Sequence, residues 1–242
     1  MVNPFAELRA FLRAALFDPV GQSREETRGT VHRRRWVAAA TLVVGAATLA
    51  WALRIPAGDP LFYPATFGLA LVWTVGALLS GPLHLGRAHT RAGTRTSRSV
   101  VQSLALGVLL LGVFLAGAIL VAAVPELRDP VQGLLDHARF GSLPLVAVIT
   151  AVNGIAEELY FRGALFAALP IRRAILGTTL VYGLTVVPTM IPLLVFAGFV
   201  LGLVVGLQRR VTGGVLGPIV THLTWSLGLL FLLPYTLDVW SA

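Results

Sequence analysis

Seven predominantly apolar stretches, most of them close to 20 residues long, constrain the fold of this chain more than any other feature. A transmembrane α-helix needs about 20 consecutive apolar residues, whereas the strands of a membrane β-barrel are roughly ten-residue segments of alternating polarity. No such alternation is present, so we predict an all-α, polytopic membrane helix bundle with about seven transmembrane helices. The expected spans are residues 36–53, 61–80, 99–124, 143–169, 174–187, 190–207 and 212–233.

The composition agrees with this class and excludes several kinds of chemistry. Charged residues make up 12% of the chain, about half the level of a soluble domain. The chain has no cysteine, so disulfides and thiolate catalysis are excluded. It also has no lysine, which excludes Schiff-base catalysis. Residues 1–35 are polar and Arg-rich and lack the short apolar region of a cleavable signal peptide.

The arginines predict how the spans are oriented. The N-terminal segment carries seven, the 81–98 connection four, and the 170–173 and 208–211 turns two each, against three in the connections on the other side. By the positive-inside rule, the N-terminus is cytoplasmic and the C-terminus is outside. The net charge of +8 therefore reflects orientation in a lipid bilayer, and we expect no nucleic-acid partner. We predict a multi-pass protein of the cell (plasma or inner) membrane.

Shorter elements complete the predicted organisation. Residues 4–17 form an amphipathic pattern that fits either a helix on the membrane surface or a loosely ordered cytoplasmic tail. Residues 129–139 predict a short surface helix, and the Pro188–Pro192 region predicts a tight hairpin. We divide the chain into an Arg-rich N-terminal segment, two leading spans with a basic loop, a membrane core and a short tail, at residues 1–35, 36–98, 99–233 and 234–242.

The fourth span contains an unusual polar stretch, NGIAEELYFRG at residues 153–163. Ionisable side chains at membrane depth cost a few kcal/mol each, so a helix that only spans would not contain three. Glu158 and Arg162 are four residues apart and share a helical face, the spacing of an ion pair. Asn153 and Glu157 share a different face. Glu157 therefore needs a partner on another helix, and a buried carboxylate of this kind is typical of a catalytic acid or base.

His222 is the only one of five histidines inside a span. From its position in the seventh span we expect it roughly 15 Å from the cytoplasmic end, close to the depth of Glu157 and of the Tyr182–Thr185 segment. A buried histidine beside a carboxylate suits acid–base chemistry or donation to an oxyanion. Two purely structural interpretations stay open. His222 could join neighbouring helices, and Glu158 with Arg162 could be a structural ion pair.

Other polar and aromatic residues have a simpler interpretation. Trp225, Trp240 and Tyr235 are expected to be packing or interfacial anchors. The glycines of the sixth span recur every four positions, at residues 198, 202 and 206, which is typical of a helix-packing face.

The run Glu157-Glu158-Leu159-Tyr160-Phe161-Arg162 matches an EExxxR motif. With His222 at the expected distance, residues 99–233 resemble the CPBP (Abi) family, the type II CAAX prenyl endopeptidases and bacteriocin-processing intramembrane proteases. The resemblance implies that Glu157 activates a water for attack on a peptide carbonyl. It further implies that Glu158 and Arg162 order the site and that His222 binds the developing oxyanion.

Two positions depart from the family pattern. The histidine of the middle FxxxH motif is replaced by Val186, and the asparagine of the last motif by Ser226. Either another group, such as Asn153, Tyr182 or Thr185, substitutes for the missing histidine, or hydrolysis is weak or absent. A metal site is disfavoured because there is no HExxH motif and only one histidine lies within a span.

We therefore expect a metal-free, cofactor-free glutamate endopeptidase that acts on a protein or peptide substrate. Exclusive use of arginine over lysine hints at a GC-rich bacterial genome, in which a prenylated substrate is not expected. Two other hypotheses stay open. One is a non-catalytic relative that acts as a scaffold, a bacteriocin-immunity protein or a sequestering factor. The other is a proton-coupled transporter, which would show internal repeats, and the sequence shows none.

Overall fold

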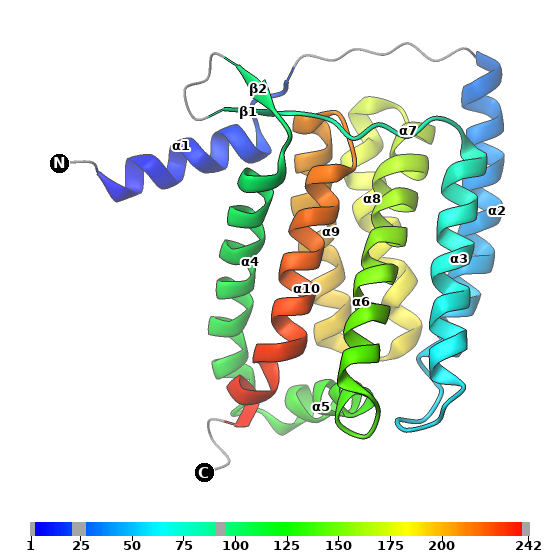
Figure 1. The fold of residues 1–242 in the computed structure, drawn as a ribbon, viewed down its shortest axis with the longest axis vertical. Helices are drawn as coiled ribbons and strands as arrows, with labels where there is room; N and C mark the ends of the chain where they lie inside the picture. Colours follow the sequence, from blue (N-terminus) through cyan, green and yellow to red (C-terminus); the bar gives the residue numbers. More distant parts are fainter. Residues whose placement is uncertain (1–2, 21–27, 91–94, 239–242) are drawn as a thin grey trace.

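The computed structural model describes residues 3–20, 28–90 and 95–238. These residues form a bundle of long helices that run up and down along a common direction (Figure 1). Six of the described helices are long and apolar enough to cross a membrane, which confirms the predicted polytopic helical fold. They are α2 (Arg28–Ala52), α3 (Phe62–Ser80), α4 (Val100–Val121), the continuous segment from α6 to α7 (Leu143–Ala168), α9 (Pro192–Thr212) and α10 (Leu216–Leu237).

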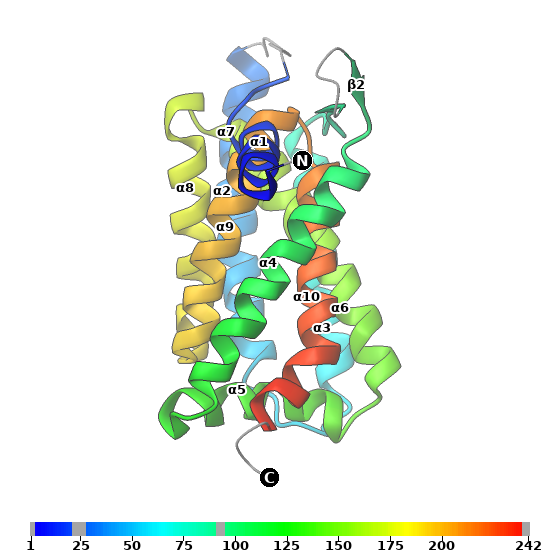
Figure 2. The same cartoon turned by 90° about the vertical axis from the view of Figure 1, so that its left-hand side faces the viewer.

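The expected fifth span is the shorter helix α8 (Ile171–Val186). Its 16 residues extend about 24 Å, less than the roughly 30 Å of a hydrocarbon core. α8 lies beside α9 and runs antiparallel to it (Figure 2). A short 3₁₀ turn, η2 (Val187–Thr189), and Met190 at φ 57° join the two helices, so the predicted hairpin at Pro188–Pro192 is present.

The chain connections segregate between the two ends of the bundle (Figure 1). The start of α2, the described parts of the 81–98 connection and the α7–α8 and α9–α10 turns lie together at one end, as the arginine distribution predicts. Arg24, Arg91 and Trp240 fall outside the described residues. The 81–98 connection contains a small antiparallel pair, β1 (Ala88–His89) and β2 (Thr96–Ser97). Helix α5 (Pro125–Arg139) crosses the opposite end and contains the predicted 129–139 helix.

Three of the long apolar helices extend clearly beyond their predicted ends. α9 continues to Thr212 rather than residue 207, so the arginines expected in the 208–211 turn lie in its last turns. α2 begins at Arg28 rather than residue 36, so several arginines belong to its first turns. Among them, Arg34 is buried and donates to Ser80 Oγ and to the carbonyl of Pro82, each at 3.2 Å, which explains why this polar segment stays helical. α10 continues past residue 233 to Leu237, because Leu237 is buried against α4 and α5.

Residues 4–17 do form a helix, α1 (Pro4–Leu16), which projects sideways from the bundle (Figure 1). Asn3 caps it, because its side chain accepts from the backbone N–H groups of Phe5 and Ala6. Its last turn packs Ala15 and Leu16 against Leu106 of α4. The structure therefore favours the ordered amphipathic helix over the loose tail.

The core is centred where α3, α6, α8 and α9 meet. Trp73 of α3 packs on Tyr160 and Phe161, with ring centroids 4.6 and 5.1 Å apart. The three glycines of α9 face α8, and a Cβ at Gly202 would meet Tyr182 at 3.4 Å. The predicted glycine packing face is confirmed, and the close approach of α9 helps to position the Tyr182 side of α8.

Candidate active site

The helix that carries the two carboxylates changes its geometry directly after them. α6 (Leu143–Glu158) continues as a π-helix, η1 (Leu159–Leu165), before the short α7 (Phe166–Ala168). π-Helical segments are rare and frequently occur at functional sites. The side chains of residues 160–165 are all buried. Sequence reasoning missed this element, because no propensity or spacing distinguishes it from a regular helix.

Glu158 and Arg162 form the predicted ion pair, and both side chains are fully buried. Arg162 Nη1 lies 3.1 Å from Glu158 Oε1. Nη2 of the same guanidinium donates to the carbonyl of Gly202 at 3.4 Å. The guanidinium carbon also lies 4.6 Å from the ring centroid of Tyr182, within the range of a cation–π contact. The pair is thus anchored to both α9 and α8.

His222 of α10 joins this pair. Its Nδ1 lies 2.8 Å from Glu158 Oε1, and the side chain is almost completely buried. An ionised carboxylate can only accept a hydrogen bond, so Nδ1 must carry the proton. The other ring nitrogen, Nε2, then accepts a proton when the imidazole is neutral and donates one when it is charged. Glu158 therefore fixes both the orientation and the tautomer of His222.

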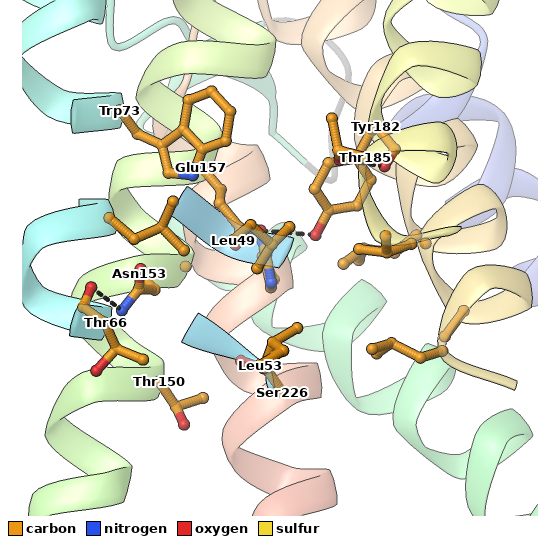
Figure 3. Close-up of a pocket in the computed structure, with 18 of the residues that line it drawn as sticks. Leu49, Leu53, Thr66, Trp73, Thr150, Asn153, Glu157, Tyr182, Thr185 and Ser226 are labelled. Atoms are coloured by element: carbon orange, nitrogen blue, oxygen red, sulfur yellow. Dashed lines mark hydrogen bonds between the residues drawn. The ribbon is translucent and has the colours of Figure 1, made fainter. Parts of the chain in front are cut away.

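Glu157 finds its partner on another helix, as its position in the sequence requires. Tyr182 of α8 donates from its hydroxyl to Glu157 Oε2 at 2.7 Å (Figure 3). One turn earlier on α6, Asn153 Nδ2 donates to the carbonyls of Thr66 and Ile149, each at 3.1 Å. The two adjacent glutamates thus have separate surroundings, one beside Tyr182 and the other between Arg162 and His222.

Glu157 borders a cavity of about 270 Å³ between the helices. Most of the cavity wall is apolar, and its ionisable side chains are Glu157, Tyr182 and His222. The cavity extends to Leu134 of α5, at the end of the bundle where α10 ends (Figure 1). It therefore combines an apolar space with a concentrated set of acid–base groups.

The cavity brings together most of the residues expected from the sequence. Asn153, Glu157, Tyr182, Thr185, His222 and Ser226 line it. Glu158 and Arg162 do not line it and lie behind His222 and Tyr182. The Thr185 hydroxyl donates to the carbonyl of Tyr182 at 2.6 Å. Its proton is therefore bonded within α8 and is not free to donate to a molecule in the cavity. Val186, in the place of the family histidine, also lines the cavity.

Several lining residues were not expected from the sequence. Thr66, Trp73 and Thr150 are single residues within apolar spans, and nothing in their spacing distinguishes them from packing residues. Trp225 packs edge-on against Phe114, with ring centroids 5.1 Å apart, in agreement with the predicted anchor role. Its indole also borders the cavity, which the sequence did not indicate.

Within the described ranges, no group of three or more His, Cys, Asp or Glu residues is arranged to hold a metal ion.

Comparison with known families adds an independent observation. Residues 139–228 match the family "Type II CAAX prenyl endopeptidase Rce1-like". This Rce1-like segment, a little over a third of the chain, contains both glutamates, Arg162, Tyr182 and His222. The match confirms the resemblance drawn from the EExxxR motif. Neither the curated proteins nor the solved structures that were compared include a match to this chain.

The six long apolar helices indicate a multi-pass membrane protein, and the Rce1-like segment is similar to a family of prenyl endopeptidases. The segment begins near the end of α5 and ends within α10, so it covers α6, α8 and α9, the helices that surround Glu157. Helices α2 and α3 lie outside it but supply part of the cavity wall.

Proposed function

We propose that this chain is an intramembrane endopeptidase in which Glu157 activates a water molecule for attack on a peptide carbonyl. The observation that carries the proposal is the contact between Glu157 and Tyr182 inside an apolar cavity that His222 also lines. The Rce1-like match supports a hydrolase of the protease kind. In a cavity of low polarity, a positioned carboxylate and a hydrogen-bond donor act more strongly than they do in water.

In the proposed reaction, each of these residues has a separate role. Glu157 accepts a proton from water while the water oxygen bonds to the peptide carbon. The proton then passes to the amide nitrogen as the C–N bond breaks, which yields a carboxylate and an amine. His222, when protonated on Nε2, donates to the carbonyl oxygen as it gains negative charge. Arg162 and Glu158 hold His222 in place through the buried contacts.

Tyr182 takes over part of the role of the missing histidine. Valine at position 186 can neither accept nor donate a proton, whereas Tyr182, one turn earlier on the same helix, contacts Glu157 directly. A phenol donates to the carboxylate and orients it, but it cannot act as a second base at neutral pH. We therefore expect slower hydrolysis than a histidine at this place would support.

The cavity favours an apolar protein or peptide substrate. Its walls offer no charged partner for a substrate side chain beyond Glu157 and His222.

We propose the lipid bilayer of the cell membrane as the surroundings of the protein, with a cytoplasmic N-terminus. We propose no nucleic-acid partner and no cofactor, and we favour hydrolysis without a metal ion.

A non-catalytic relative is the second candidate function. The observation that favours it is Val186, which lines the cavity in the place of the family histidine. A protein of this kind would keep the fold and the cavity to bind, sequester or shield a membrane partner. It predicts that replacing Glu157 leaves the cellular phenotype unchanged.

Peptide cleavage by the purified protein in nanodiscs tests the proposal. A library of quenched-fluorescence peptides is incubated with the wild type, with Glu157→Gln and with Glu126→Gln as the control for an exposed carboxylate. The expected result is cleavage by the wild type and by Glu126→Gln, loss of cleavage in Glu157→Gln, and no effect of a chelator. Retained cleavage in Glu157→Gln overturns the proposed role. Inhibition by the chelator overturns the metal-free mechanism. No cleavage by a folded wild type supports the non-catalytic candidate.

A further inference from the structure

The side-chain amide of Asn153 has a fixed orientation. Its nitrogen donates to the carbonyls of Thr66 on α3 and Ile149 on α6, and Figure 3 shows the first of these bonds between the two helices. Carbonyl oxygens can only accept, so the NH₂ group must face them and the amide cannot be flipped. Oδ1 is consequently directed away from both carbonyls. It is buried, and no group in the described part of the chain hydrogen-bonds to it.

The residue that carries this acceptor lies in the cavity wall beside the acid–base groups. Asn153 lines the cavity four residues before Glu157, about 6 Å along the helix. The next residue, Gly154, brings the α6 backbone close to His222, since a Cβ there would lie 3.8 Å from His222 Nε2. Asn153, Glu157 and His222 therefore border one continuous space.

Helix α10 carries hydrogen-bond donors in the same condition. Trp225 and Ser226 of α10 line the cavity, and Trp225 Nε1 and Ser226 Oγ are buried and have no hydrogen-bond partner among the described residues. The cavity residues of α6 thus include an acceptor, and those of α10 include donors. A peptide group offers one N–H and one C=O, which is the complement of these groups. An apolar side chain offers neither.

A helical peptide cannot use these groups, because its main-chain N–H and C=O groups bond to each other. An extended peptide leaves them free. At about 3.3 Å per residue, the rise between Asn153 and Glu157 corresponds to roughly two residues of extended chain. The fixed acceptor is therefore within reach of the main chain close to the bond that Glu157 attacks.

We propose that Asn153 Oδ1 accepts a main-chain N–H of the substrate within about two residues of the scissile bond, so that the cavity selects locally unwound apolar segments. The proposal rests on the proposed function for its scissile bond. It assigns Asn153 a substrate-binding role in addition to its contact with α3. The donors of α10 accommodate a substrate carbonyl.

An amide-to-ester scan of one peptide tests this role. The probe is an apolar quenched-fluorescence peptide from the cleavage library, synthesised with a single ester in place of each successive amide. kcat/KM and equilibrium binding are measured for the wild type, for Asn153→Leu and Asn153→Ala, and for Thr150→Val as a matched change in the same wall. In the wild type, the ester at one position near the cleavage site is expected to weaken kcat/KM and binding about fivefold, the worth of one hydrogen bond. In both Asn153 variants the loss at that position disappears, and in Thr150→Val it stays.

Two results overturn the role of Asn153. One is a wild type with no position-specific ester effect, and the other is an effect that persists in both Asn153 variants. The binding readout separates this proposal from the proposed function. A wild type that binds peptides with the position-specific effect but cleaves none keeps the role of Asn153 in recognition and overturns the peptidase. Thermal unfolding of each variant shows whether it is folded, and the wild-type scan gives its result without any variant.

Discussion

The hydroxyl of Tyr182 donates to the carboxylate of Glu157 at 2.7 Å, across the interface between α8 and α6. Glu157 has no partner on its own helix, so this contact orients the carboxylate that we propose as the base. A hydrogen bond to a charged group contributes about 1.5–3 kcal/mol, which corresponds to roughly 10–100-fold in rate if it acts in the transition state.

Replacing Tyr182 by phenylalanine should therefore lower kcat by about 10–100-fold. The aromatic ring keeps its packing against Phe161 and Arg162, so the variant should stay folded, with a thermal midpoint lowered by the loss of one buried hydrogen bond. Tyr63→Phe is the matched control, because the Tyr63 hydroxyl accepts from the backbone of Ser142 near α5 and lies outside the cavity wall. Unchanged kcat in Tyr182→Phe contradicts the orienting role.

Introducing histidine at position 186 should increase cleavage. Val186 lines the cavity on the helix that carries Tyr182, and a histidine there adds a group that can accept a proton from water. General-base assistance contributes about 100-fold or more, so we expect Val186→His to raise kcat by at least tenfold. Val181→His, on the same helix but outside the cavity wall, controls for the added imidazole. If neither variant gains activity, hydrolysis does not need a second base at this place.

The two adjacent glutamates should respond differently when each is changed to glutamine. Glu158→Gln leaves the fully buried Arg162 without its carboxylate, and breaking a buried pair in this way costs about 3–5 kcal/mol. Glu157→Gln keeps a group that can still accept from Tyr182. Thermal unfolding in the same detergent should therefore show a much lower midpoint for Glu158→Gln than for Glu157→Gln. Equal midpoints would show that the ion pair contributes little to stability.

The orientation in the membrane can be tested with single cysteines, because the natural chain has none. Ser97 lies in the 81–98 connection, Asp129 lies on α5, and both are exposed. In intact cells, a membrane-impermeant maleimide should label the Asp129→Cys variant and not the Ser97→Cys variant. Disruption of the membrane should make both react. Labelling of Ser97→Cys alone in intact cells would reverse the predicted orientation.

Features set by local rules could be predicted from the sequence. Bilayer thickness determines the length of an apolar span, so most span boundaries were predicted within a few residues. The four-residue spacing of Glu158 and Arg162 required no tertiary information. The similar depths of Glu157, His222 and Tyr182 followed from counting residues along spans of known direction, and the cavity contains all three.

Features that depend on contacts between helices could not be predicted. The sequence did not identify Tyr182 as the specific partner of Glu157, and it did not connect His222 to Glu158 rather than to Glu157. The orientation of the Asn153 amide is fixed by a carbonyl 87 positions away along the chain. The polar start of α2 was predicted as a connection because propensity could not anticipate that Arg34 contacts the end of α3.

The π-helix η1 has a consequence for the span that contains it. Its backbone bonds run from residue i to i+5 rather than i+4, so each turn holds more residues than the turns before it. Side chains after Leu165 consequently point in directions that a single helical wheel drawn from Leu143 would not give. An insertion or deletion before η1 therefore changes the directions of different side chains from one after it. A one-residue deletion within it, which would restore regular α-helical bonding, would rotate the α7 end of the span against the glutamates.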